Sequence, residues 1–146
     1  MSNQLFGTYR EALLDQTAFN WGTGIARAAA ITSAVTQTEV DEAVNMDELT
    51  AKVANLRSIR ISGMIVGPTG EALSGNIVFE GLFVSLALGV IIYEEGDGAD
   101  VDDNNPDADA TARVLAYIDA GTGIPFVPAG GTTTIQPSGS THFFRV

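Results

Sequence analysis

The chain has 146 residues, of which 45% are hydrophobic and 17% charged, and this balance predicts one domain with a real core rather than a disordered chain. Its 18 Asp and Glu residues outnumber its 7 Lys and Arg residues, and the resulting net charge of -11 would repel nucleic acid and anionic membranes. Because the chain has no cysteine, disulfides, thiolate catalysis and cysteine-based metal sites are excluded.

The first predicted element is an N-terminal helix over residues 3–16. Leu5, Tyr9 and Leu13 recur at the spacing of one helical face. The N-terminus has no basic stretch followed by an apolar one, so no signal peptide is expected and the protein is predicted to be made in the cytoplasm. The most apolar run, residues 82–93, is too short to span a membrane, so no membrane partner is expected.

The next predicted elements are strands separated by a long polar connection. Residues 25–32 contain four alanines and are predicted as a closely packed strand. Residues 33–56 are polar and helix-compatible, which favours a connecting segment with one or two short helical turns. The periodicity then changes to two, which predicts half-buried strands from residue 59 toward 66 and around residues 77–79.

The second half of the chain continues the β pattern. Residues 82–93 predict a buried strand pair or one long bent strand, and further strands are expected at 113–119, 132–136 and 142–146. These signals favour a mainly β fold, either an antiparallel β-sandwich, for example a jelly roll, or a partly closed barrel. With its N-terminal helix, this fold is predicted to form a single domain over residues 1–146.

An acidic segment over residues 94–110 carries eight of the 18 carboxylates. Such a charge run cannot bury itself, so we predict an exposed, flexible loop. Its oxygen-rich, glycine-containing composition also suits calcium, with Asp97, Asp100, Asp102 and Asp103 as candidate ligands. Their spacing does not match an EF-hand, and no glutamate closes the loop. The solvated loop is therefore the favoured interpretation, with a weak calcium site as the alternative.

No catalytic set is recognisable in the sequence. His142 is the single histidine, and nothing in the pattern supplies it with an orienting partner and a nucleophile. Asp119 precedes a glycine-rich turn and is expected to stabilise it. The glycines at 121–123 and 130–131 match neither the dinucleotide motif nor the P-loop and are interpreted as hairpin turns. We therefore expect no enzyme activity, no cofactor and no resident metal.

Several stretches of the chain carry a likeness to known proteins. The C-terminal third contains a distinctive run over residues 115–131, followed by the β-branched residues 132–135 and a closing Phe143–Val146. The aromatic N-terminal helix, the tripeptide Phe19–Asn20–Trp21 and the run Val90–Tyr93 accompany it. In these features the chain resembles a family of small tailed-bacteriophage virion proteins.

The resemblance implies a capsid decoration or cement protein on the surface of the virion, made in the host cytoplasm. Such a protein binds the outer surface of the head and stabilises contacts of the major capsid protein. The implied partners are the major capsid protein and further copies of the chain in a homo-oligomer, a trimer. The N-terminal segment and the apolar strands are expected to make these contacts, because cementing requires buried area on two sides of a small body.

Two alternatives stay open at this point. The first is another virion role, as a tail, neck or fibre-adaptor component. The second is a calcium-dependent carbohydrate-binding module, in which Trp21, Tyr93 or Tyr117 stacks on a sugar and the acidic loop holds the ion.

Overall fold

The computed structural model of the chain describes most of its elements. The described residues are 4–14, 19, 24–61, 65–66, 71–73, 76–97, 109–119, 124–136 and 142–145.

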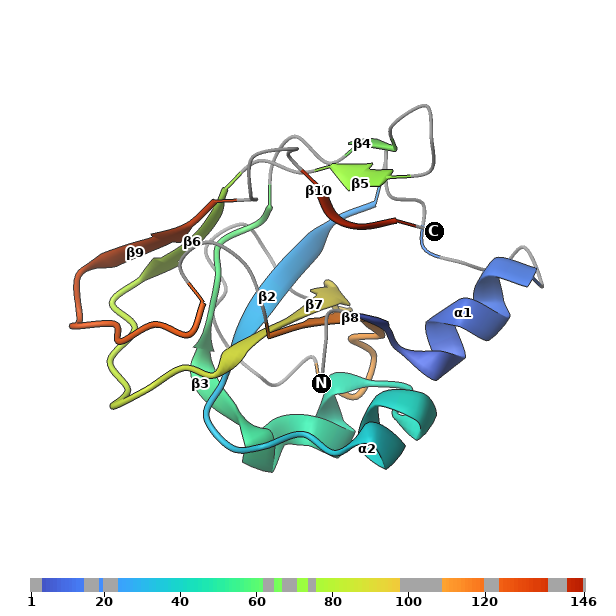
Figure 1. Cartoon of the computed structure of the whole chain (residues 1–146), viewed down its shortest axis with the longest axis horizontal. Coiled ribbons are helices and arrows are strands. Elements are labelled where there is room, and N and C mark those ends of the chain that lie inside the picture. The colour runs from blue at the N-terminus through green and yellow to red at the C-terminus, as the bar shows by residue number, and fades with distance from the viewer. Residues whose placement is uncertain are drawn as a thin grey trace.

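The centre of the fold is a five-stranded antiparallel sheet in the order β1–β8–β7–β2–β3 (Figure 1). In chain order its strands are β1 (Gln4–Leu5), β2 (Ala26–Ile31), β3 (Val53–Arg57), β7 (Gly89–Glu94) and β8 (Val114–Ile118). Every position of β2 and β8 is buried, as is every position of β7 except Glu94. Strands buried on both faces show continuous apolar runs, which explains the patterns of these three segments.

The predicted N-terminal helix is confirmed in its centre as α1 (Gly7–Leu14). Gln4 and Leu5, expected to lie in the helix, instead form strand β1 and pair with Tyr117 and Ala116 of β8. The helix begins at a glycine for a steric reason. A Cβ on Gly7 would collide with the backbone carbonyl of Asp41, so only glycine allows α1 to approach the next helix this closely.

The predicted polar connection contains two short helices, α2 (Gln37–Glu42) and η1 (Met46–Lys52). Thr36 caps α2 through a capping box: its hydroxyl accepts from the Glu39 amide, and the Glu39 carboxylate accepts from the Thr36 amide. The connection is shorter than predicted, because β3 already begins at Val53. The strand expected from residue 59 toward 66 is confirmed only at its end, as β4 (Ile65–Val66), because residues 58–61 are not in a strand. β3 lies before them and was missed, since Arg57 takes a buried strand position and its charge masks the alternation.

Two smaller sheets complete the fold. A three-stranded sheet has the order β10–β5–β4, and a two-stranded sheet pairs β6 with β9. Their strands are β4 (Ile65–Val66), β5 (Glu71–Leu73), β6 (Ile77–Glu80), β9 (Thr132–Ile135) and β10 (His142–Arg145). The mainly β, antiparallel fold with an N-terminal helix is thus confirmed, and the described strands do not close into a barrel. None of the described helices is long and apolar enough to cross a membrane.

The apolar run 82–93 does not form one continuous strand. Its second part is β7, while its first part leaves the central sheet and runs beside residues 124–130 through isolated bridges from Phe83 to Ala129 and from Ala87 to Phe126. Figure 1 shows these two segments, with β6 and β9, along one margin of the molecule.

Candidate functional site

A partly buried ion-pair network fixes the start of the acidic segment. The Glu95 carboxylate accepts hydrogen bonds from Arg27 Nε at 2.8 Å and from Arg60 Nε and Nη2 at 2.8 and 2.6 Å. Burial opposes the charge of Glu95, but the hydrogen bonds from Arg60 and Arg27 outweigh it and hold its pKa below the usual value. Beside it, Glu94 pairs with Arg113 at 3.0 Å.

The far end of the acidic segment is fixed in the same way. Asp109 is 5% exposed and accepts two hydrogen bonds from Arg57, at 2.9 Å from Nη1 and 2.8 Å from Nη2. The Arg57 guanidinium also lies 5.5 Å from the ring centroid of Tyr93. Burial opposes the charge of Arg57, but the bond to Asp109 outweighs it and the pKa of Arg57 is raised.

These contacts correct the expectation that residues 94–110 form an exposed loop throughout. Both ends of the segment are held by ion pairs. Glu95 pairs with Arg27 of β2 and with Arg60 just after β3, and Asp109 pairs with Arg57 of β3. Residues 98–108, between the pinned ends, lie outside the described residues. No local pattern indicates this arrangement, because Arg57 and Asp109 stand 52 positions apart.

The candidate calcium ligands are described only in part. Asp97 is exposed, and its backbone amide donates to the Thr111 hydroxyl at 2.8 Å. Asp100, Asp102 and Asp103 lie outside the described residues. Across the described part of the chain, no three histidine, aspartate or glutamate side chains gather in a way that could hold a metal ion.

The aromatic side chains considered for sugar stacking are not at the surface. Tyr93 is 4% exposed and Tyr117 is 6% exposed, so neither ring offers a face to a carbohydrate. Assigning this role to the two tyrosines is therefore wrong, because both belong to strands covered on two sides. Trp21 lies outside the described residues.

The two remaining candidate residues, Asp119 and His142, lie at the ends of strands. Asp119 is half-buried at the end of β8 and accepts a hydrogen bond from the Tyr117 hydroxyl at 3.2 Å. The turn that it was expected to stabilise, 120–123, falls outside the described residues. His142 begins β10, where its backbone pairs with Leu73 of β5.

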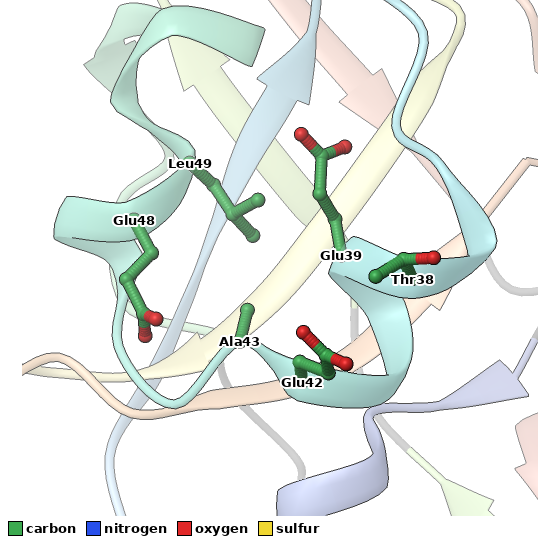
Figure 2. Close-up of a pocket in the computed structure, with 6 residues that line it drawn as sticks. All are labelled: Thr38, Glu39, Glu42, Ala43, Glu48 and Leu49. Atoms are coloured by element: carbon green, nitrogen blue, oxygen red, sulfur yellow. The ribbon is translucent and has the colours of Figure 1, made fainter.

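A shallow acidic pocket of about 170 Å³ lies between α2 and η1 (Figure 2). Its lining residues are Thr38, Glu39, Glu42, Ala43, Glu48 and Leu49. Two of the three carboxylates serve the helix ends: Glu39 belongs to the capping box, and Glu48 accepts from the amides of Val44 and Asn45. Glu39 also lies 3.5 Å from the Lys52 ammonium. The pocket is thus held open by the local helix geometry.

An apolar surface is the most distinctive exposed feature. We call residues 77–88 and 124–135, which include β6 and β9, the arm. Phe83 is 79% exposed on the arm, Val127 is 68% exposed and Leu86 is 42% exposed. The Phe83 ring lies next to Gly130, which adopts a φ of 89°. Clusters of exposed apolar side chains on a folded protein mark sites of protein interaction.

The charge distribution sets the arm apart from the rest of the chain. The two longest stretches without a charged residue are 120–144 and 81–93, and together they supply most of the arm. Elsewhere, six basic side chains in the described part of the chain form ion pairs with acids of the chain itself. The arm is therefore a largely apolar surface on a strongly acidic protein, with the exposed Glu80 at the end of β6 as its one charged residue. Sequence reasoning assigned Phe83 to a buried strand, although the missing charges were visible.

Three comparisons with known proteins were negative. No family model, no curated protein and no solved structure matches it.

Proposed function

We propose that the chain is a structural protein of a tailed-phage virion, a capsid decoration or cement protein. It binds the outer surface of the head as a homo-oligomer and stabilises the contacts of the major capsid protein. The observation that carries this proposal is the arm, where Phe83, Leu86 and Val127 are presented to solvent. Together with the resemblance to phage virion proteins, this surface favours a role in assembly.

The proposal is consistent with how the body around the arm is built. Stable protein contacts bury about 1,200–2,000 Å² in total, and a small body must keep its shape to present such an area. Here the ends of the acidic segment are pinned by Arg57 on Asp109 and by Arg27 and Arg60 on Glu95. The arm thus belongs to a body in which ion pairs fix both described ends of the acidic segment.

Heads that lack the protein provide the direct test. Purified wild-type chain is added to particles from a phage deleted for its gene, and the temperature at which the particles release DNA is measured. We expect the chain to bind the heads to saturation and to raise that temperature. Particles that neither bind the chain nor gain heat resistance would contradict the proposal.

A matched pair of variants tests the arm itself. Phe83→Ser removes the most exposed apolar side chain of the arm, and we expect binding to heads to weaken by at least about tenfold, which corresponds to about 1.4 kcal/mol. Leu14→Ser is the control, because Leu14 at the end of α1 is 86% exposed and lies outside the arm. Equal loss of binding in both variants would show that the arm has no special part in docking.

A further inference from the structure

Strand β9 presents an open edge. It pairs with β6 alone among the described strands, in the register Ile77 to Ile135, Val78 to Thr134, Phe79 to Thr133 and Glu80 to Thr132. The other edge of β6 is occupied, because the Val78 carbonyl accepts a hydrogen bond from the Ile59 amide at 3.0 Å. Figure 1 shows β9 and β6 together at one margin of the molecule.

The register determines which backbone groups of β9 face outward. In an antiparallel pair, residues alternate between those that bond each other and those that point away. The backbone carbonyl of Val78 points away from β9, because it accepts from the Ile59 amide. The backbone amide and carbonyl of the opposite residue, Thr134, therefore point away from β6, and so do those of Thr132, two positions earlier. The bond from the Gly81 amide to the Gly131 carbonyl at 3.1 Å fits the same alternation.

The outward groups have no partner within the described part of the chain. They are the amide and carbonyl of Thr132 and of Thr134, four groups in all. Natural proteins shield such edges with charged residues, proline or bulges, and none of these occurs between Thr132 and Ile135. An exposed, uncharged edge of β-branched residues is instead suited to accept another strand.

We propose that β9 pairs with β9 of a second copy of this chain, antiparallel and about a two-fold axis at Thr133. In this register Thr132 faces Thr134 of the second copy on both sides of the axis. Four hydrogen bonds then form and all the outward groups are satisfied. The result is a continuous four-stranded sheet, β6–β9–β9–β6. The inference rests on the homo-oligomer of the proposed function and makes its unit a two-fold pair through β9, in place of the trimer that the resemblance implies.

Charge argues for a second copy as the occupant. A basic partner would be drawn to the acidic body rather than to the arm, since residues 120–136 carry no charge. Two copies with a net charge of -11 each repel one another, so they approach most easily through their β9 edges, which carry no charged residue. The spacing of the outward groups on β9 is also self-complementary, as an isologous two-fold contact requires.

The apolar part of the arm lies on the same ribbon as this edge. Phe83 bridges to Ala129, three residues before β9 begins. The paired sheet therefore brings an exposed aromatic residue of each copy close to the contact.

Sedimentation equilibrium of the purified chain tests the pairing. We expect a mass that approaches twice the 15.2 kDa of one chain as concentration rises. Thr134→Pro removes an outward amide without breaking the ladder to β6, and we expect it to weaken association by at least about tenfold. Thr134→Val keeps the backbone groups and should associate like wild type. A wild-type monomer at all concentrations, a trimer, or an unchanged dimer in Thr134→Pro overturns the proposal.

Amide hydrogen exchange gives a second readout on the unmodified chain. The amides of Thr132 and Thr134 should exchange slowly at high concentration and faster on dilution. The Thr133 amide, which pairs with Phe79 inside the sheet, should be protected from exchange at both protein concentrations. Equal exchange of Thr132 and Thr134 at the two concentrations overturns the pairing.

The inference and the proposed function can fail separately. A monomer that still binds heads refutes this inference alone, whereas a β9-paired dimer that does not bind heads refutes the proposed function alone.

Discussion

Arg57 holds Asp109 through two parallel hydrogen bonds of 2.9 and 2.8 Å, and both side chains are buried. The pair joins the last residue of β3 to the end of the acidic segment, 52 positions further along the chain. A buried bidentate pair of this kind is fully satisfied only while both partners are present. The pair therefore attaches the C-terminal end of the acidic segment to the central sheet, shortly before β8 begins.

Removing the charge of Asp109 should destabilise the protein strongly. Asp109→Asn leaves the Arg57 guanidinium buried without a counter-charge, and the free energy of unfolding should fall by about 3–5 kcal/mol. Urea denaturation at pH 7 measures this loss. Asp97→Asn, which changes an exposed carboxylate at the other end of the segment, should stay within about 0.5 kcal/mol of wild type. Equal effects of the two substitutions would refute the role given to the pair.

The Glu95 cluster predicts a loss of stability in acid. The pKa of Glu95 is below its usual value in the folded protein, so its contribution is fully present above the unfolded value of 4.5. That contribution disappears as the pH falls through the lowered folded pKa. The free energy of unfolding should therefore decline below about pH 4.5, and Glu95→Gln should flatten part of the decline. A variant with the wild-type slope in acid would show that Glu95 plays no part in it.

The three tyrosines predict an unusual alkaline titration. Burial raises the pKa of Tyr9 and Tyr93 above 10.0, and burial followed by the charge of Asp119 raises the pKa of Tyr117 to about 12. Absorbance of tyrosinate should therefore stay below half its final amount at pH 10 while the protein is folded. Tyrosinate present at half its final amount at pH 10 in the folded protein would contradict this environment.

The raised pKa of Tyr117 also sets the sign of the alkaline stability change. The folded state keeps a proton that the unfolded state loses, so the contribution is full below pH 10 and is lost between pH 10 and about 12. Tyr117→Phe should make the free energy of unfolding less dependent on pH in that range. Denaturation series at pH 9 to 11 provide the comparison, and an identical slope in both proteins would speak against the assignment.

Gly89 is predicted to resist substitution by alanine. A Cβ there would collide with the carbonyl oxygen of Ile118 in β8, where β7 and β8 meet. Gly89→Ala should lower the free energy of unfolding by about 1–3 kcal/mol. Gly131→Ala is the matched control, because no atom lies within 4 Å of a Cβ built there. Similar thermal midpoints for the two variants would mean that β7 and β8 are not this close at Gly89.

The parts of the fold that follow local rules were predictable from the sequence. The continuous apolar runs of β7 and β8 marked buried strands, and the periodicity of Tyr9 and Leu13 marked α1. The start of α1 was not predictable, since it depends on the close approach of Gly7 to Asp41. Local periodicity contains no information about that contact.

The parts that depend on distant partners were missed. Glu95 and Asp109 were expected in an exposed loop because they are charged. Asp109 is instead buried against Arg57, and Glu95 is half-buried against Arg27, each a counter-charge far along the chain. Phe83 was expected inside because it is apolar, yet no described layer covers the arm there. Charge and apolarity predict burial only when the partners of a side chain are known.

The copy number of the chain in purified virions tests the central claim most directly. Quantitative mass spectrometry of purified particles compares it with the major capsid protein of the same phage. A decoration protein is predicted to be present at a fixed ratio and in the same order of abundance as the major capsid protein. A small set of copies, as at a single neck or tail position, or the absence of the chain from virions would contradict the account.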